Sequence, residues 1–108
     1  IPLAEESRLI HKIWEWTFET TCNQIQQWCQ KYGEAIKIGI NLSGRQFEQP
    51  DLVEKVKNTI IAKGIQPKYV DIKVTETAVM TNVRVAIDAL EQFREFGLQI
   101  SVDDFGSG

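Results

Sequence analysis

Apolar residues recur along the chain with two different periods, and the change of period separates helices from strands. Between about Ala4 and Lys31 they recur every three or four positions, which predicts one long amphipathic helix whose tryptophans lie in the core. Gly33 suits the left-handed residue that commonly ends a helix. The positions expected on the buried stripe are Ile10, Ile13, Trp14, Phe18, Cys22, Ile25 and Cys29.

Three short runs show the period of two that is typical of strands. They span residues 35–42, 69–76 and 98–102. In the first run Ile36, Ile38 and Ile40 share the apolar face, and Asn41 finishes the strand on the other face. In the second run Glu76 continues an apolar face, and such local inconsistencies tend to mark function. An equal alternative is that Glu76 emerges into solvent where the strand stops.

Two further helices are predicted between the strands. Asp51 suits the first turn of one, which Gly64 ends, while Thr81-Asn82 can cap the other, which Gly97 ends. Their inward stripes are Leu52, Val53, Val56 and Ile60, and then Val83, Ala86, Ile87, Leu90 and Phe93. Residues 43–49 and 65–68 are predicted as links without regular structure. Helical connections of this length keep successive strands parallel, so the fold class is α/β with the order α-β-α-β-α-β.

Composition and charge narrow the class of protein. The 108 residues form one domain at most, and 43% hydrophobic with 25% charged residues is typical of a soluble globular chain. A net charge of −3 gives no electrostatic reason to expect a nucleic-acid polymer as partner. No apolar run approaches membrane-spanning length and the N-terminus lacks a signal-peptide pattern, so no membrane contact by this segment is expected.

The cysteines and the single histidine are not expected to form a site. Cys22 and Cys29 lie seven positions apart on the predicted helix, roughly 10 Å along its axis, and therefore cannot pair with each other. Two thiols without a disulfide framework predict a reducing, cytoplasmic setting. His11 has no cluster of Cys or His beside it and is expected to be an ordinary helix residue.

Adjacent carboxylates end the third strand. Asp103 and Asp104 directly precede a glycine-rich segment, residues 106–108. Carboxylates this close repel each other unless a metal or a proton holds them, and oxygen ligands suit Mg²⁺ or Mn²⁺ better than zinc. The alternative is a solvated Asp-Asp turn with glycines for the bend.

The three predicted strands end in Asn41, in Glu76 and in Asp103-Asp104, each one β-α step after the last. The carboxyl ends of parallel strands lie on one rim, which is where α/β sheets and barrels keep their active sites. One amide and three carboxylates there predict a site for hard divalent cations, including an arrangement of two metals about 3.5–4 Å apart that share a carboxylate.

Three segments make the chain recognisable. Residues 40–47, 74–77 and 102–108 closely resemble the Asn-Leu-Ser, Thr-Glu and Asp-Asp-Phe-Gly-Thr-Gly motifs of the bacterial EAL domain, in the same order and spacing. The resemblance runs from end to end of the chain. It implies a section of a TIM-like (β/α)8 barrel, and an activity that hydrolyses cyclic di-GMP to its linear dinucleotide with Mg²⁺ or Mn²⁺.

The resemblance also implies roles for particular residues. Asn41, Glu76 and Asp103 would be metal ligands. Asp103 would bridge to a second metal that Asp104 also helps to bind, so that Glu76 and the two aspartates form the catalytic set. Two cations are expected in the complete domain.

Three positions depart from the family pattern. Thr77 and Ser107 keep a hydroxyl group where Ser and Thr are common, whereas Lys73 stands where the family often has an acidic residue. None of these changes removes a ligand. The Glu-Ala-Leu motif, the later lysine and the proposed general base have no counterpart, so residues 1–108 are expected to be a partial EAL domain that lacks the N-terminal Glu-Ala-Leu strand and the C-terminal part of the barrel.

The function expected of the complete domain is that of a cyclic di-GMP-specific phosphodiesterase in bacterial signalling. The 108-residue piece alone is expected to be inactive and to self-associate through open sheet edges. One alternative is a non-catalytic EAL-like module that binds cyclic di-GMP or a protein. Another is a different Mg²⁺-dependent barrel enzyme with the same rim.

Overall fold

The computed structural model describes the backbone of residues 3–103 and the side chains of residues 8–102. The elements are α1 (Leu3–Tyr32), β1 (Ile38–Leu42), α2 (Gly44–Phe47), α3 (Leu52–Lys63), the 3-10 turn η1 (Pro67–Tyr69), β2 (Val70–Thr75), α4 (Glu76–Thr81), α5 (Val83–Phe96) and β3 (Gln99–Asp103). The predicted long helix, the two crossover helices and the three strands are all confirmed.

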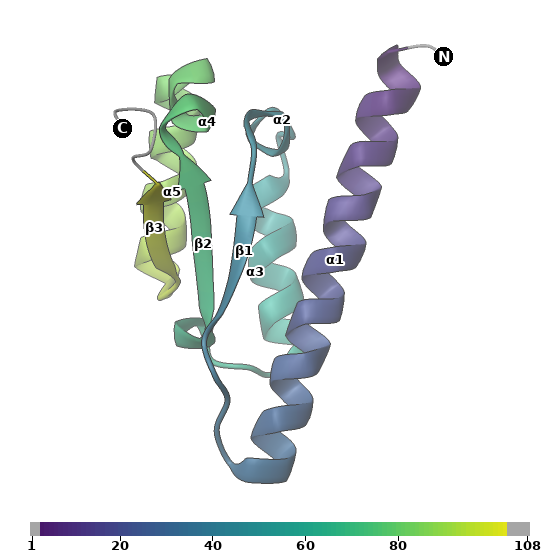
Figure 1. The fold of residues 1–108 in the computed structure, drawn as a ribbon, viewed down its shortest axis with the longest axis vertical. Helices are drawn as coiled ribbons and strands as arrows, with labels where there is room; N and C mark the ends of the chain where they lie inside the picture. Colours follow the sequence, from purple (N-terminus) through teal and green to yellow (C-terminus); the bar gives the residue numbers. More distant parts are fainter. Residues whose placement is uncertain (1–2, 104–108) are drawn as a thin grey trace.

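The strands form one parallel sheet in the order β1-β2-β3. Helices α3 and α5 cover one face of this sheet, and α1 flanks β1 on the side away from β2 (Figure 1). The predicted fold class, α/β with three parallel strands alternating with helices, is therefore confirmed. Asn41 lies opposite Lys73 and Lys73 opposite Ser101, so these three side chains share one row on the face away from α3 and α5.

The core lies between the sheet and the helices. Val70, Ile72 and Val74 of β2 are at most 1% exposed, because β2 is the central strand and its apolar face lies under the helices. The helices contribute Phe18, Cys22, Ile25, Val56, Ile60, Ala86 and Phe93, all of which are 2% exposed or less. Burial of this apolar surface is the main stabilising contribution to the fold.

The predicted helix ends are also confirmed. Asn82 precedes α5, and its side-chain oxygen accepts a hydrogen bond from the Val85 backbone N–H at 3.4 Å. Gly64 and Gly97 end α3 and α5 with φ of +66° and +111°, which residues with a Cβ rarely adopt.

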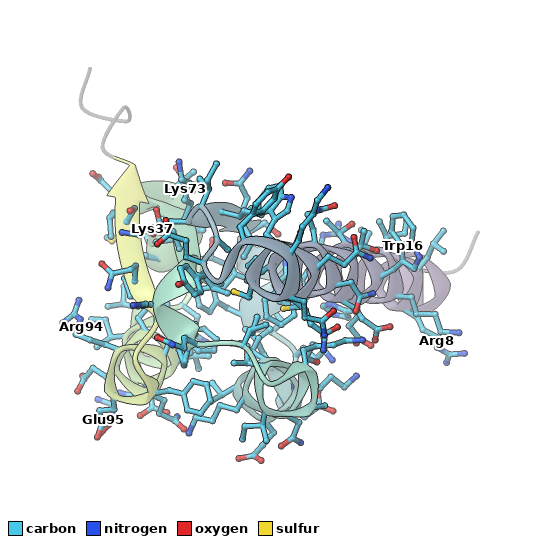
Figure 2. All side chains as sticks on the ribbon, turned by 90° about the horizontal axis from the view of Figure 1, so that it is seen from below. Arg8, Trp16, Lys37, Lys73, Arg94 and Glu95 are labelled. Atoms are coloured by element: carbon cyan, nitrogen blue, oxygen red, sulfur yellow. The ribbon has the colours of Figure 1, made fainter. Side chains whose placement is uncertain are left out.

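Five side chains predicted to be buried are exposed instead: Ile13, Trp16, Ile36, Val83 and Ile87. Ile13 and Trp16 of α1 are 56% and 70% exposed, and Trp16 points away from the rest of the chain (Figure 2). The N-terminal half of α1 reaches past β1, so only one side of its wide apolar stripe has described neighbours. Ile36 is 73% exposed because it precedes β1, and Ile87 is 46% exposed because α5 packs through Ala86, Ala89 and Phe93.

Two short helices interrupt segments that were predicted as a link and as a strand end. Helix α2 lies inside the predicted link at residues 43–49, and α4 begins at Glu76. The second strand therefore stops at Thr75, and Glu76 does not continue its apolar face. Thr75 caps α4, since its hydroxyl oxygen accepts a hydrogen bond from the Ala78 N–H at 3.0 Å.

Candidate functional site

The predicted site residues lie at the carboxyl ends of neighbouring strands. Asn41 is the penultimate residue of β1, and Glu76 directly follows the last residue of β2. Thr75 lies opposite Asp103, the last residue of β3, whereas Asn41 lies opposite Lys73, two residues earlier on β2. Asn41 is therefore one row below the level of Glu76 and Asp103. Asp104 falls outside the described residues.

The donor groups suit a hard divalent cation. Asn41 and Glu76 are exposed, and neither side chain is hydrogen-bonded to another side chain or backbone group of residues 8–102. One amide oxygen and one carboxylate are ligands that Mg²⁺ and Mn²⁺ prefer. Within residues 8–102, no three His, Cys, Asp or Glu side chains lie close enough to hold a metal. A carboxylate cluster at this rim therefore depends on Asp103 and Asp104.

The loop that follows Asn41 is held by a side chain that the sequence prediction missed. Gln46 is 5% exposed, and its Oε1 accepts a hydrogen bond from the Ser43 backbone N–H at 2.9 Å. The spacing of Ser43 and Gln46 is that of a capping box, which is the signal that could have located α2. A Cβ on Gly44 would lie 3.1 Å from the Thr81 hydroxyl, so α2 packs closely on α4. The loops after β1 and β2 thus support each other.

A second missed contact reaches Asn41 from α1. The indole Nε1–H of Trp14 donates a hydrogen bond to the Asn41 carbonyl oxygen at 2.9 Å. Both residues line a hollow of about 400 Å³ between α1 and β1. The sequence gives no local signal for this bond, because the two residues belong to different elements.

Lys73 places a positive charge on the same face as Asn41. Its side chain lies across β1 beneath Asn41, since a Cβ on Gly39 would be 2.5 Å from the Lys73 Cε. The nearby Asp71 carboxylate accepts a hydrogen bond from the Ser101 hydroxyl at 2.9 Å. No carboxylate of residues 8–102 lies within ion-pair distance of Lys73. Lys37 and Lys73 lie on the side of the sheet opposite α3 and α5 (Figure 2).

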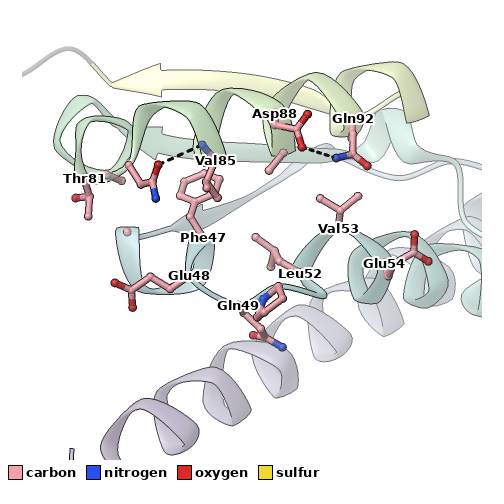
Figure 3. Close-up of a pocket in the computed structure, with 15 residues that line it drawn as sticks. Phe47, Glu48, Gln49, Leu52, Val53, Glu54, Thr81, Val85, Asp88 and Gln92 are labelled. Atoms are coloured by element: carbon pink, nitrogen blue, oxygen red, sulfur yellow. Dashed lines mark hydrogen bonds between the residues drawn. The ribbon is translucent and has the colours of Figure 1, made fainter. Parts of the chain in front are cut away.

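A larger hollow lies away from the predicted site residues. It measures about 600 Å³ and is bounded by α2, α3, α4 and α5 on the helix side of the molecule (Figure 3). Neither Asn41 nor Glu76 lines it. Its carboxylates are Glu48, Glu54 and Asp88, and Asp88 accepts a hydrogen bond from Gln92. This hollow is therefore separate from the predicted site residues.

Cys22 is part of the buried core. Both cysteines are free, and burial raises the pKa of the Cys22 thiol to about 12. A thiol with so high a pKa is protonated at neutral pH and is a poor nucleophile or metal ligand.

In residues 3–103 no helix combines the length and the apolar character that crossing a membrane requires.

Parallel strands joined by helices, with polar side chains at their carboxyl ends, are also found in TIM-like barrels. A solved structure, the PaMucR phosphodiesterase in complex with c-di-GMP, is similar with a TM-score of 0.82 and 36% sequence identity, over 99% of this chain and 46% of that chain. The family model of the EAL domain matches residues 1–108. The chain belongs to the EAL domain family.

Curated relatives extend the comparison. The bifunctional diguanylate cyclase/cyclic di-GMP phosphodiesterase MucR of Pseudomonas aeruginosa is 35% identical over 108 residues, which are 100% of this chain and 16% of MucR. The signaling protein YkoW of Bacillus subtilis is 36% identical over 108 residues, again 100% of this chain and 13% of that protein. The chain thus spans a small part of the length of these relatives.

Proposed function

We propose that this chain contributes Asn41, Glu76, Asp103 and Asp104 to the active site of a cyclic di-GMP phosphodiesterase. The observation that carries the proposal is the placement of Asn41, Glu76 and the end of β3 on one rim of a chain that belongs to the EAL family. The similarity to a phosphodiesterase solved with c-di-GMP supports this substrate.

The proposed cofactor is Mg²⁺ or Mn²⁺, with two ions in a complete domain. Asn41, Glu76 and Asp103 would hold the first ion, and Asp103 and Asp104 the second. Bound ions of this kind lower the pKa of a coordinated water and stabilise negative charge on phosphate oxygens. The exposed oxygen donors of Asn41 and Glu76 support this assignment.

The protein's own contribution is to orient these donors. The Thr75 hydroxyl caps α4 and so fixes the backbone from which Glu76 projects. The bond from the Ser43 N–H to Gln46 fixes the turn that follows Asn41. Donors held in place by such supporting bonds lose less conformational entropy when they ligate a cation.

The 108-residue chain by itself is proposed to be inactive and to self-associate. It covers 46% of the solved PaMucR chain, and β1 and β3 are edge strands of the described sheet. Unpaired strand edges are templates for pairing with another chain. The cytoplasm is the proposed location, in keeping with two free cysteines.

The test is turnover of cyclic di-GMP by a complete EAL domain that contains residues 1–108, with Mg²⁺ or Mn²⁺ present. Metal-dependent formation of the linear dinucleotide is expected. Asp103→Asn and Glu76→Gln should abolish it at ordinary metal concentrations. The matched control is Glu34→Gln, which alters an exposed carboxylate before β1, at the opposite end of the sheet.

Each outcome decides between functions. Turnover that the two site variants lose and the control keeps supports the phosphodiesterase. Binding of cyclic di-GMP without turnover makes the domain a receptor instead. Near-normal turnover by Glu76→Gln contradicts the assignment of that residue.

A further inference from the structure

The indole of Trp14 is fixed at both its ring and its N–H. The ring is 9% exposed and stacks on Phe18, with 5.3 Å between ring centroids and 7° between the planes. The Nε1–H donates to the Asn41 carbonyl oxygen at 2.9 Å. A buried Trp N–H usually finds an acceptor, and here the acceptor belongs to a proposed metal ligand.

The bond supplies a donor on the side of β1 that has no strand neighbour among the described elements. β1 pairs with β2 only, and α1 flanks its other side (Figure 1). A backbone carbonyl that no donor satisfies costs free energy when it is shielded from water. The carbonyl of Asn41 belongs to the peptide plane shared with Leu42, so the bond restricts the backbone angles that direct the Asn41 side chain.

A second bond restricts the next part of the same segment. Gln46 accepts from the Ser43 N–H, two residues after Asn41. Residues 41–43 are therefore held from α1 on one side and from α2 on the other. The exposed Asn41 side chain is thus attached to a backbone that cannot turn freely.

We propose that Trp14 is a positioning residue for the proposed metal site. Its indole N–H holds Asn41 in the orientation from which the amide oxygen ligates a divalent cation. This inference rests on the proposed function, since it assigns Asn41 to the metal. Mutation of a group that orients a metal ligand typically lowers the metal affinity.

The test uses a complete EAL domain that contains residues 1–108, in three forms: wild type, Trp14→Phe and Trp28→Phe. Phenylalanine keeps an aromatic ring on Phe18 but lacks the N–H. Trp28 is the matched control, because it lies partly buried on the same helix and has no side-chain hydrogen bond within residues 8–102. The Mn²⁺ dissociation constant is measured by calorimetry without substrate, and unfolding temperatures are measured in parallel.

Loss of one hydrogen bond predicts a dissociation constant about three- to tenfold higher for Trp14→Phe. Trp28→Phe should stay within about twofold of wild type, and saturating Mn²⁺ should restore most of the turnover of Trp14→Phe. An unchanged dissociation constant in Trp14→Phe, with Mn²⁺ bound normally by wild type, overturns the inference and leaves the proposed function intact. No Mn²⁺ binding by wild type overturns the proposed function itself.

A second measurement does not depend on a variant that folds. Hydrogen exchange of the Trp14 Nε1–H in the wild-type domain, followed by NMR, should be much slower than in a free indole. Addition of Mg²⁺ should shift its resonance. Exchange at the rate of a free indole, or a resonance that Mg²⁺ leaves unmoved while it binds, overturns the inference.

Discussion

The two faces of β2 differ sharply in their exposure to solvent. Val70, Ile72 and Val74 point under the helices and are at most 1% exposed. Lys73, between them in sequence, is exposed on the opposite face, in one row with Asn41 and Ser101. In the described residues, one face of β2 therefore forms the core, and the other carries polar and charged side chains.

The contrast shows where sequence patterns are informative about function. On the helix face, any large polar residue would lose its hydration, so the pattern of residues reports burial. On the other face, which is exposed in the described residues, each polar residue must be judged by its neighbours across the sheet. The row that joins Asn41, Lys73 and Ser101 follows from the register and not from the local sequence.

The largest expected effect comes from a truncation on the helix face. Ile72→Ala should lower the free energy of unfolding by about 2–5 kcal/mol, because it leaves a cavity in the centre of the core. Lys73→Ala, one residue away, should change it by about 0.5 kcal/mol or less. Urea denaturation of both variants measures the difference.

Similar losses of unfolding free energy in the two variants would contradict the conclusion that only one face of β2 is buried. A large loss in Lys73→Ala would mean that the exposed face is covered in the complete domain. The lysine would then be part of a buried ion pair, since an unpaired buried charge is strongly destabilising.

The next largest effect is expected on metal affinity, through the charge of Lys73 beside the proposed metal ligand Asn41. Its strand neighbour is Asn41, and adjacent strands lie about 4.8 Å apart. A unit charge about 8 Å from a divalent cation repels it by roughly 1 kcal/mol in water, less in salt. Lys73→Met should therefore lower the Mn²⁺ dissociation constant about two- to fivefold.

Lys37→Met is the matched control for this measurement. Lys37 lies on the same face but about 13 Å further along the strand direction, so its removal should have little effect. The difference between the two variants should also shrink as salt is added. Weaker Mn²⁺ binding in Lys73→Met would mean that the lysine supports the site instead of opposing the cation.

The sequence predicted the helices and strands well, but it predicted the burial of their side chains less well. The ends of α5 at Asn82 and Gly97 were predictable because a cap and a left-handed glycine are local signals. Helix α4 was missed because six residues are too few for a helical period, although Thr75 before Glu76 is a cap signal. The exposure of Trp16 could not be predicted, since it depends on how far α1 reaches past β1.

In the candidate site, too, some features were predictable from the sequence and others were not. Asn41 and Glu76 were predicted from strand ends and from a family resemblance, and the structure places them on one rim. The hydrogen bonds that hold the residues of this rim in place were not predictable. The bond from Trp14 to Asn41 joins residues 27 positions apart, so no local pattern contains it.

The smallest expected effect on stability is that of removing the partly exposed ion pair between α1 and α3. Lys55 Nζ lies 2.7 Å from the Glu15 carboxylate, with side chains 41% and 36% exposed. Burial alone would raise the pKa of Glu15, but hydrogen bonds from Lys55 and Gln49 outweigh it and leave the pKa below its ordinary value of 4.5. The hydrogen bond to Glu15 chiefly raises the pKa of Lys55 above 10.5.

The ion pair should therefore stabilise the fold only between the pH at which Glu15 becomes protonated and the pH at which Lys55 loses its proton. The contribution of Glu15 is present above its unfolded pKa and is lost as the pH falls through its lower folded pKa. The contribution of Lys55 is present below its unfolded pKa and is lost as the pH rises through its higher folded pKa. For a pair this exposed, Lys55→Ala should cost about 0.5 kcal/mol at pH 7.

Urea denaturation of wild type, Lys55→Ala and the control Lys37→Ala at pH 7 and pH 3 measures this contribution. At pH 3 the cost of Lys55→Ala should be smaller, because Glu15 loses its charge as the pH falls through its folded pKa. A cost that is unchanged at pH 3 would mean that Glu15 contributes little and that Lys55 acts through Asp51 or through packing of its aliphatic stem. Even then the effect should remain several times smaller than that of Ile72→Ala, since this side chain is partly exposed and Ile72 is fully buried.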